Sequence, residues 1–232
     1  MQEESRIDDL FTDNYYVRLG LTYVGTNEHE AIKNFTLAIQ KNPKNVDAYF
    51  LRGDSYFALE EYEEAVEDFT KVIQLNPTEA GAYYNRSLAY YELGKYKEAI
   101  RDATKAIEIV PDYQYAYCCR GNCYYKLEKF EKAIRDYTKA IEINPNFHEA
   151  YRNRANAYYQ VEKFAKAVVD YTKAIELDPK DAASYHNRGK AKYFLGDIVG
   201  AKEDIDMAHQ LYPILPDFET MGSHLLNLIK KK

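Results

Sequence analysis

HEAYRNRANAYYQVEKFAKAVVDYTKAIELDPKD, residues 148–181, aligns with almost every other segment of this 232-residue chain. The spacing of proline shows the repetition most clearly. Proline recurs every 34 residues through five intervals, at Pro43, Pro77, Pro111, Pro145, Pro179 and Pro213. A fixed period of this length indicates tandem structural repeats that stack on one another.

Other residue types recur with the same period and form a packing pattern. When the proline is counted as position 32 of each repeat, position 4 is tyrosine in repeats two to six, and positions 8, 20 and 27 are small in most copies. Helices approach closely only where side chains are small, and a large aromatic side chain fills the space that remains. The pattern therefore predicts pairs of closely packed helices.

Each repeat is predicted to be a helical hairpin. Apolar residues recur at helical spacing in both halves of a repeat, a short turn separates the halves, and the recurring proline ends the second helix. The predicted organisation is a lead-in at 1–11, six repeats, and a capping helix at 216–232. The repeats span 12–45, 46–79, 80–113, 114–147, 148–181 and 182–215.

Composition and charge exclude several classes of function. The net charge of -6 provides no basic surface for a phosphate backbone, so nucleic acid is not the expected partner. No apolar run reaches the roughly 18 residues of a membrane span, and the first residues lack the pattern of a signal peptide. The three cysteines lie within six residues and cannot staple a chain of this length, which fits a reducing compartment. A cytoplasmic protein with no membrane contact is expected.

Aligned on these positions, the chain resembles the tetratricopeptide repeat (TPR) family over about 200 residues. The resemblance rests on the 34-residue period, the aromatic residues at positions 4, 11 and 24, the small residues at 8, 20 and 27, and the proline at 32. Departures are local: Lys192 replaces the aromatic residue at position 11, and Ala103 and Ile205 replace that at position 24.

The resemblance to this family implies both a fold and a kind of function. The implied fold is all-α, a right-handed α-solenoid (superhelix) of six antiparallel helix pairs with a C-terminal capping helix, whose first helices line a concave groove. The implied function is the binding of extended peptides or helices in that groove, without chemistry of its own.

Charged residues occupy two positions inside the packing pattern. Position 7 is arginine and position 23 is aspartate in repeats two to six, whereas the first repeat has Leu19 and Asn34 there. The pairs are Arg52 and Asp68, Arg86 and Asp102, Arg120 and Asp136, Arg154 and Asp170, and Arg188 and Asp204. Because the two residue types occur together or not at all, we expect structural ion pairs that tie the helices together. The alternative is that the arginines are presented to an acidic ligand.

The resemblance places positions 2, 5, 6, 9 and 13 of each repeat toward the groove. From these positions the candidate peptide-binding residues are Asn85, Asn122, Lys126, Arg152, Asn153, Asn156, His186, Asn187 and Lys190. A carboxamide offers both an acceptor and donors, so it can pair with the backbone of an extended peptide without reading its side chains. The alternative is that these asparagines are ordinary solvated surface residues.

A sharper alternative is the dicarboxylate clamp with which some family members grip the acidic C-terminus of a heat-shock protein. Arg152, Asn156 and Asn187 match three of its five positions, with arginine in place of lysine. The other two positions fall on Asp217 and Met221 instead of cations. The chain therefore resembles a co-chaperone with a degenerate clamp at most.

No constellation of residues points to catalysis, to a metal or to a cofactor. Cys119 and Cys123 lie one helical turn apart and supply two ligands, but no histidine or cysteine at zinc spacing completes a site. Cys123 is more simply interpreted as a small core residue. The expected function is a protein-interaction scaffold, not an enzyme, that binds a peptide segment of an unidentified partner protein. The alternative is a structural subunit that forms homo-oligomers through its terminal helices.

Overall fold

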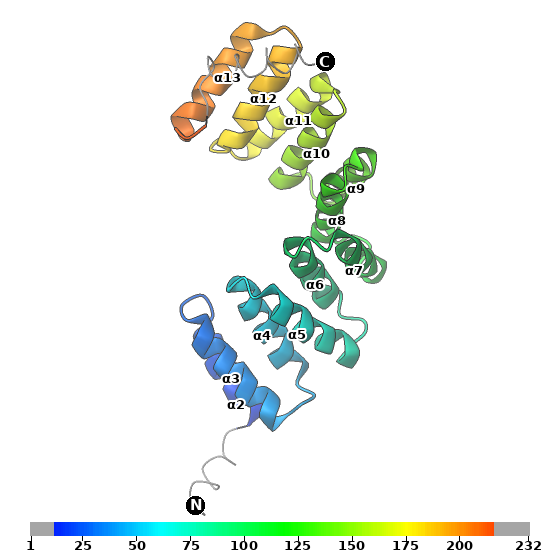
Figure 1. The fold of residues 1–232 in the computed structure, drawn as a ribbon, viewed down its shortest axis with the longest axis vertical. Helices are drawn as coiled ribbons and strands as arrows, with labels where there is room; N and C mark the ends of the chain where they lie inside the picture. Colours follow the sequence, from blue (N-terminus) through cyan, green and yellow to red (C-terminus); the bar gives the residue numbers. More distant parts are fainter. Residues whose placement is uncertain (1–11, 216–232) are drawn as a thin grey trace, which may run out of the picture. The chain divides into compact units, whose positions relative to one another are not determined.

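The computed structural model describes residues 12–215, and this part of the chain consists of α-helices joined by short turns (Figure 1). It divides into two compact units, which we call the N-terminal unit, up to Cys123, and the C-terminal unit, from Tyr124 onward. The boundary falls within one helix, α8. The predicted lead-in at 1–11 and the predicted capping helix at 216–232 lie outside the described residues.

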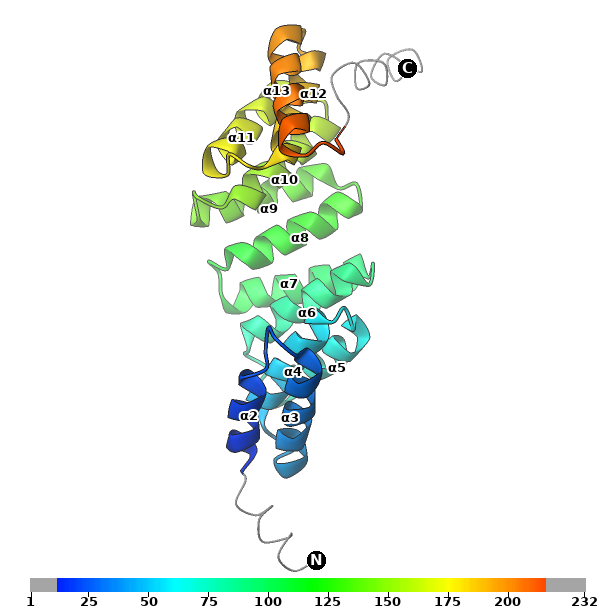
Figure 2. The same cartoon turned by 90° about the vertical axis from the view of Figure 1, so that its left-hand side faces the viewer.

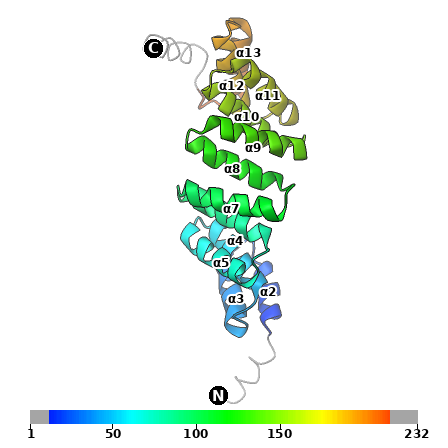
Figure 3. The ribbon, with the colours of Figure 1, turned by 90° about the vertical axis from the view of Figure 1, so that its right-hand side faces the viewer.

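The N-terminal unit contains three complete helical hairpins and most of α8. Its helices are α2 (Asp13–Leu21), α3 (Glu28–Lys41), α4 (Val46–Ala58), α5 (Tyr62–Leu75), α6 (Ala80–Glu92), α7 (Tyr96–Ile109) and α8 (Gln114–Lys126). Helix α4 packs against α3 before it and α5 after it, and α6 packs in the same way between α5 and α7 (Figure 3). Each hairpin therefore buries its apolar faces against its neighbours in the sequence.

The C-terminal unit repeats this arrangement. Its helices after the end of α8 are α9 (Phe130–Ile143), α10 (His148–Gln160), α11 (Phe164–Leu177), α12 (Ala182–Phe194) and α13 (Ile198–Leu211). Helix α10 packs against α9 and α11, and it also contacts α12, the first helix of the next hairpin (Figure 2). This last contact brings side chains from two successive first helices together.

The turn inside each hairpin has one residue in the left-handed region of backbone conformation. That residue is a glycine in three hairpins, Gly25, Gly94 and Gly196, and a glutamate in the three others, Glu60, Glu128 and Glu162, with φ between 57° and 62°. A residue with a Cβ pays about 1 kcal/mol there. The next residue's N–H closes the turn, as Lys163 N donates to Tyr158 O at 2.8 Å, which satisfies a carbonyl at the end of the helix.

The first hairpin departs from the others because α2 ends early. The sequence spacing from Gly20 to Ala31 is one residue shorter than in the other repeats, which predicts a shortened turn. The structure shows the reverse: the connection Thr22–Asn27 has six residues, whereas α4 and α5 are joined by three. Thr22 caps α2 by donating from its Oγ1 to the carbonyl of Leu19 at 2.7 Å, so the helix loses its last turn and the connection gains length.

The conserved spacing of arginine and aspartate along the repeats produces a bidentate contact. Arg52 Nε donates to Asp68 Oδ2 at 2.7 Å and Arg52 Nη2 donates to Asp68 Oδ1 at 2.8 Å. The same contact recurs in three further repeats, between Arg86 and Asp102, Arg154 and Asp170, and Arg188 and Asp204. In the remaining repeat Asp136 is 6% exposed and Arg120 is partly buried. The geometry is that of a structural tie between the two helices of a hairpin.

A third group completes each tie, and sequence reasoning missed it. The remaining nitrogen of the arginine, Nη1, donates to the Oγ1 of a threonine sixteen residues earlier, on the second helix of the preceding repeat. The partners are Thr36, Thr70, Thr104, Thr138 and Thr172. Each guanidinium therefore links one repeat to the next, and the four that also bond an aspartate join three helices. The last repeat has Asp206 at the threonine position.

Candidate functional site

Six of the predicted binding residues lie on two helices of the C-terminal unit. Helix α10 carries Arg152, Asn153 and Asn156, and α12 carries His186, Asn187 and Lys190. Residues four apart lie on the same face of a helix, which groups Arg152 with Asn156 and His186 with Lys190. Because α10 and α12 are in contact, these side chains form one polar row, which we define as Asn156, His186, Asn187 and Lys190.

The centre of the polar row is a hydrogen bond between two carboxamides. Asn187 Nδ2 donates to Asn156 Oδ1 at 3.3 Å, and the hydroxyl of Tyr171 donates to the same oxygen at 2.6 Å. Within residues 12–215, this leaves the Asn156 amide nitrogen and the Asn187 carbonyl oxygen without a protein partner. The pair therefore presents one donor and one acceptor.

Lys190 and His186 lie beside this pair and are partly buried. The Lys190 Nζ lies 5.3 Å from the centroid of the Tyr159 ring, and no carboxylate in the described part of the chain pairs with it. Burial lowers the pKa of Lys190. Burial, and secondarily the charge of Lys190, lower the pKa of His186, whose Nδ1 is buried without a partner among the described residues. The row thus holds an imidazole whose burial favours the neutral form and an ammonium group that no carboxylate of the described residues neutralises.

Arg152 is not a free cation of this row, because it belongs to a cluster around Asp181. Its Nη1 lies 3.4 Å from Asp181 Oδ2, which also bonds His148 Nε2 at 2.8 Å and Ser184 Oγ at 2.6 Å. Burial favours the neutral form of Asp181, but the bonds from Ser184 and His148 and the charge of Arg152 outweigh it and hold the pKa of this carboxyl below its usual value. Asp181 also caps α12, so the cluster has a structural role.

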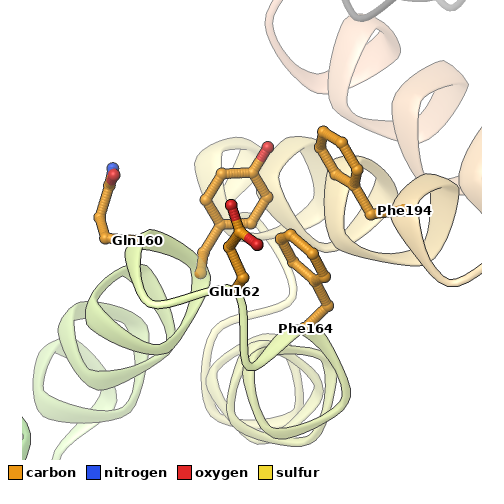
Figure 4. Close-up of a pocket in the computed structure, with 5 residues that line it drawn as sticks. Gln160, Glu162, Phe164 and Phe194 are labelled. Carbon is orange, nitrogen blue, oxygen red and sulfur yellow. The ribbon is translucent and has the colours of Figure 1, made fainter. Parts of the chain in front are cut away.

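An aromatic pocket adjoins the polar row through Tyr159. The pocket, of about 300 Å³, is lined by Tyr159, Gln160, Glu162, Phe164 and Phe194. The rings of Phe164 and Phe194 stack with centroids 4.8 Å apart and an interplanar angle of 8°. Figure 4 shows these two rings side by side, with Gln160 set apart from them. The sequence analysis did not predict this pocket. The available signal was Phe194, an aromatic residue at position 13 of the last repeat, where repeats two to five have Ala, Glu, Lys and Gln.

The other predicted binding residues lie apart from the row. Asn153 is half-buried on α10, and Lys126 is exposed at the end of α8. Asn122 and Asn85 belong to the N-terminal unit. Asn85 Nδ2 donates to Asp54 Oδ1 at 2.7 Å, and both line a pocket of about 230 Å³ with Phe57, Ala58 and Leu88. The Asn85 amide nitrogen is therefore already bonded to the Asp54 carboxylate, a residue that the sequence analysis did not predict as part of a site.

Asp54 makes the stability of the N-terminal unit depend on pH. Burial raises the pKa of its carboxyl from 3.8 to about 6, against the opposing hydrogen bond from Asn85. The stability that this raised pKa contributes is therefore fully present below pH 3.8 and is lost as the pH rises through about 6. After allowance for the exposed part of the side chain, we expect a loss of roughly 1–2 kcal/mol.

Asp54→Asn should remove this dependence, so the variant should gain stability relative to the wild type as the pH rises. Urea midpoints of both proteins, measured at about pH 5 and about pH 7.5, check this expectation. A difference between the two proteins that stays constant with pH would contradict it.

The three cysteines are buried on α8. Ser87 Oγ lies 3.2 Å from Cys119 Sγ, and hydrogen bonds from Cys123 and Ser87 outweigh burial and lower the pKa of the Cys119 thiol. In the part of the chain that the structure describes, no group of three His, Cys, Asp or Glu side chains is placed to hold a metal ion. The cysteines fill space between helices.

The hairpins and their ties define an all-α solenoid assembled from tandem repeats. Family models described as "Tetratricopeptide repeat" match residues 34–67, 80–113, 115–147, 148–181 and 170–203, and one described as "TPR repeat" matches 53–94. The chain belongs to the tetratricopeptide repeat family, which confirms the resemblance seen in the sequence. No curated protein matches the chain.

Solved structures with the same fold include several repeat proteins. The structure of YrrB, titled "a TPR protein with an unusual peptide-binding site", is 25% identical, covers 78% of this chain and 93% of its own, and has a TM-score of 0.64. A structure of MamA is 28% identical with a TM-score of 0.65, covering 71% of this chain and 96% of its own. PilW, titled a "widely conserved type IV pilus biogenesis factor", is 21% identical with a TM-score of 0.79 over 90% of this chain and 97% of its own, a likeness in fold alone.

These likenesses define a general function for the chain, that of a protein-interaction scaffold. The fold is typical of scaffolds without catalytic activity. Among residues 12–215, no helix combines the length and the apolar character that crossing a bilayer requires.

Proposed function

We propose that the scaffold binds an extended segment of a partner protein along the polar row of α10 and α12. The observation that carries this proposal is the carboxamide pair of Asn156 and Asn187, whose mutual bond leaves one donor and one acceptor without a partner among residues 12–215. Each residue of an extended segment carries one N–H and one C=O, so the pair is complementary to the backbone of one residue. Such a contact holds the backbone of a ligand without reading its side chains.

Lys190 and the aromatic pocket, which adjoin each other at Tyr159, supply side-chain selectivity next to this backbone contact. A half-buried ammonium group without a carboxylate partner favours an anionic ligand group. A charge-assisted hydrogen bond from such a group replaces the stabilisation of the charge by water, which burial has reduced. The pocket beside Phe164 and Phe194 accepts an apolar side chain. The expected ligand is therefore an extended segment with an acidic and an apolar residue. The likeness to YrrB, a protein described by its peptide-binding site, supports this class of ligand.

The arginine ties do not take part in this binding. Each guanidinium is held by a threonine of its own chain, and four of them also by an aspartate, as Arg154 is by Asp170 and Thr138. A ligand carboxylate would have to displace a bidentate partner, at a cost that a surface contact does not offset. Arg152 is disfavoured for the same reason, since Asp181 lies against it.

A peptide-display selection with a matched pair of variants tests the proposal. Peptides selected on the wild-type protein are measured by titration calorimetry against Asn187→Ala with Lys190→Met. Asn156 is left unchanged, because Tyr171 is 1% exposed and its hydroxyl depends on that carboxamide. We expect affinity to fall at least about tenfold, which corresponds to about 1.4 kcal/mol or more.

The matched control is Asn146→Ala with Lys180→Ala, which removes the same residue types from exposed positions of the same unit. Its affinity should equal that of the wild type. If both double variants bind selected peptides as tightly as the wild type, the polar row is not the binding site.

A further inference from the structure

The pocket around Asp54 in the N-terminal unit contains a charge that the protein itself does not neutralise. The hydrogen bond that the described residues make to the carboxylate comes from the neutral amide of Asn85, at 2.7 Å to Oδ1. Among the described residues, no lysine, arginine or histidine pairs with Asp54. Arg52 lies on the same helix, but Asp68 and Thr36 occupy all three of its nitrogens.

Asp54 lacks a cationic partner among the described residues, and in this it differs from the paired aspartates at position 23 of the repeats. The aspartates at position 23 that the structure pairs are each held by two nitrogens of an arginine, as Asp68 is by Arg52. Asp54 occupies position 9, which is Leu88, Asn122, Asn156 and Lys190 in the following repeats. A half-buried carboxylate without a cation is costly, because burial disfavours the charged form. Nothing in the described fold requires it, since Asn85 could bond a neutral side chain equally well.

The walls of the pocket are apolar. Phe57 and Ala58 follow Asp54 on α4, and Leu88 lies on α6. A ligand that fills this space must combine a positive charge with an aliphatic stem, since a small hydrated cation would leave the apolar walls uncovered. The pocket volume of about 230 Å³ admits one long side chain.

We propose that this pocket binds a lysine side chain of a partner protein, with the ammonium group on Asp54 and the aliphatic stem against Phe57 and Leu88. Lysine fits better than arginine, because Asn85 already occupies Oδ1 and the free Oδ2 offers one point of contact. A guanidinium binds best when both oxygens of a carboxylate are available, whereas an ammonium group acts as a point charge.

The titration of Asp54 agrees with this assignment. Its pKa of about 6 marks a carboxylate that lacks a counter-charge. A bound ammonium group favours the ionised form, so lysine binding should release protons near pH 6 and weaken as the pH falls below that value. Burial and the hydrogen bond from Asn85 are the influences on this pKa. Of the charged residues on the helices packed against α4, Lys33 on α3 pairs with Glu30, Asp68 on α5 bonds Arg52, and Arg86 on α6 bonds Asp102.

This inference goes beyond the proposed function and does not depend on it, because the pocket lies in the other unit and uses other residues. The test uses a single-residue probe, Nα-acetyl-lysine-N-methylamide, added to the 232-residue chain. Binding is followed by NMR through the side-chain amide of Asn85 and the methyl groups of Leu88. Two further probes replace lysine by norleucine, which keeps the stem, and by glutamine, which keeps polarity without charge.

We expect the lysine probe to shift both sets of signals saturably, with a dissociation constant on the order of 10 mM or lower, and at least about tenfold more tightly than either other probe. Asp54→Asn, which preserves shape and the contact with Asn85, should abolish this preference. The matched control Asp47→Asn removes an exposed carboxylate from the same helix and should leave it unchanged. Equal binding of the norleucine probe, an unchanged lysine preference in Asp54→Asn, or no saturable shift with lysine would each overturn the proposal.

Discussion

Arg154→Leu is expected to lower the free energy of unfolding of the C-terminal unit by about 3–5 kcal/mol. Arg154 donates two hydrogen bonds to Asp170, at 2.7 and 2.8 Å, and one to Thr138 at 3.0 Å. The Asp170 side chain is 6% exposed. Leucine fills the space of the arginine stem but leaves this carboxylate buried without a counter-charge, which is the main source of the loss.

Adding Asp170→Asn to Arg154→Leu should recover part of that loss, because the double variant no longer buries a charge. The pair is therefore expected to be strongly non-additive. Urea unfolding monitored by circular dichroism gives the total change, and amide hydrogen exchange in α10 and α11 locates it. The matched control is Arg135→Leu, an exposed arginine on α9, which should change stability by about 0.5 kcal/mol or less. Additive losses would mean that the two side chains do not act as a pair.

The fold was predictable because its determinants are local or periodic. Proline at a fixed period marks the ends of the second helices, and the small residues at position 20, such as Ala65 and Ala133, are fully buried where the helices meet. The co-occurrence of arginine at position 7 and aspartate at position 23 also indicated that these two side chains contact each other, since both positions lie within one hairpin. The role of Thr138 was not predicted, because its partner Arg154 lies in the next repeat and co-occurrence within one repeat does not indicate contacts between repeats. A periodic threonine at position 25 was the available signal.

The candidate site was less predictable because it depends on side-chain contacts between helices. Spacing alone places Asn156 and Lys190 on accessible faces, but it does not show that Asn156 bonds Asn187 and Tyr171. It also does not show that Asp181 lies against Arg152. Whether a polar residue is available to a ligand depends on what its neighbours in space already bond. Sequence patterns identify the residue types, and the folded arrangement determines which of their atoms remain unsatisfied.

Phe69→Ala is expected to lower the free energy of unfolding of the N-terminal unit by about 3–5 kcal/mol. Phe69 is fully buried, and its ring fills the space over Gly53, where a Cβ would lie 2.9 Å from Phe69 Cε1. Removing the ring forfeits its burial and leaves a cavity between α4 and α5 that the helix backbones cannot close. The loss should appear as a lower urea midpoint and as faster amide exchange in these two helices.

Gly53→Ser should be destabilising alone and stabilising in the Phe69→Ala background. Alone, its Cβ overlaps the Phe69 ring, at a cost of about 1–3 kcal/mol. With the ring absent, the side chain occupies part of the cavity, and its hydroxyl can donate to the Phe50 carbonyl as Ser87 Oγ does to Tyr84 O at 2.6 Å. The double variant copies the third repeat, where Ser87 and Ala103 hold these positions and both are fully buried.

Gly81→Ser provides the control, because a Cβ there meets only the end of the flexible Glu79 side chain, at 3.3 Å, and the Phe50 ring, at 3.5 Å. It should cost little in either background. The decisive result is that the effect of Gly53→Ser on stability changes sign between the wild-type and the Phe69→Ala background. It would show that positions 8 and 24 of a repeat are chosen as a pair to fill one volume. If Gly53→Ser lowered stability equally with and without the Phe69 ring, backbone preference at position 53 would account for the glycine, and the two positions would be independent.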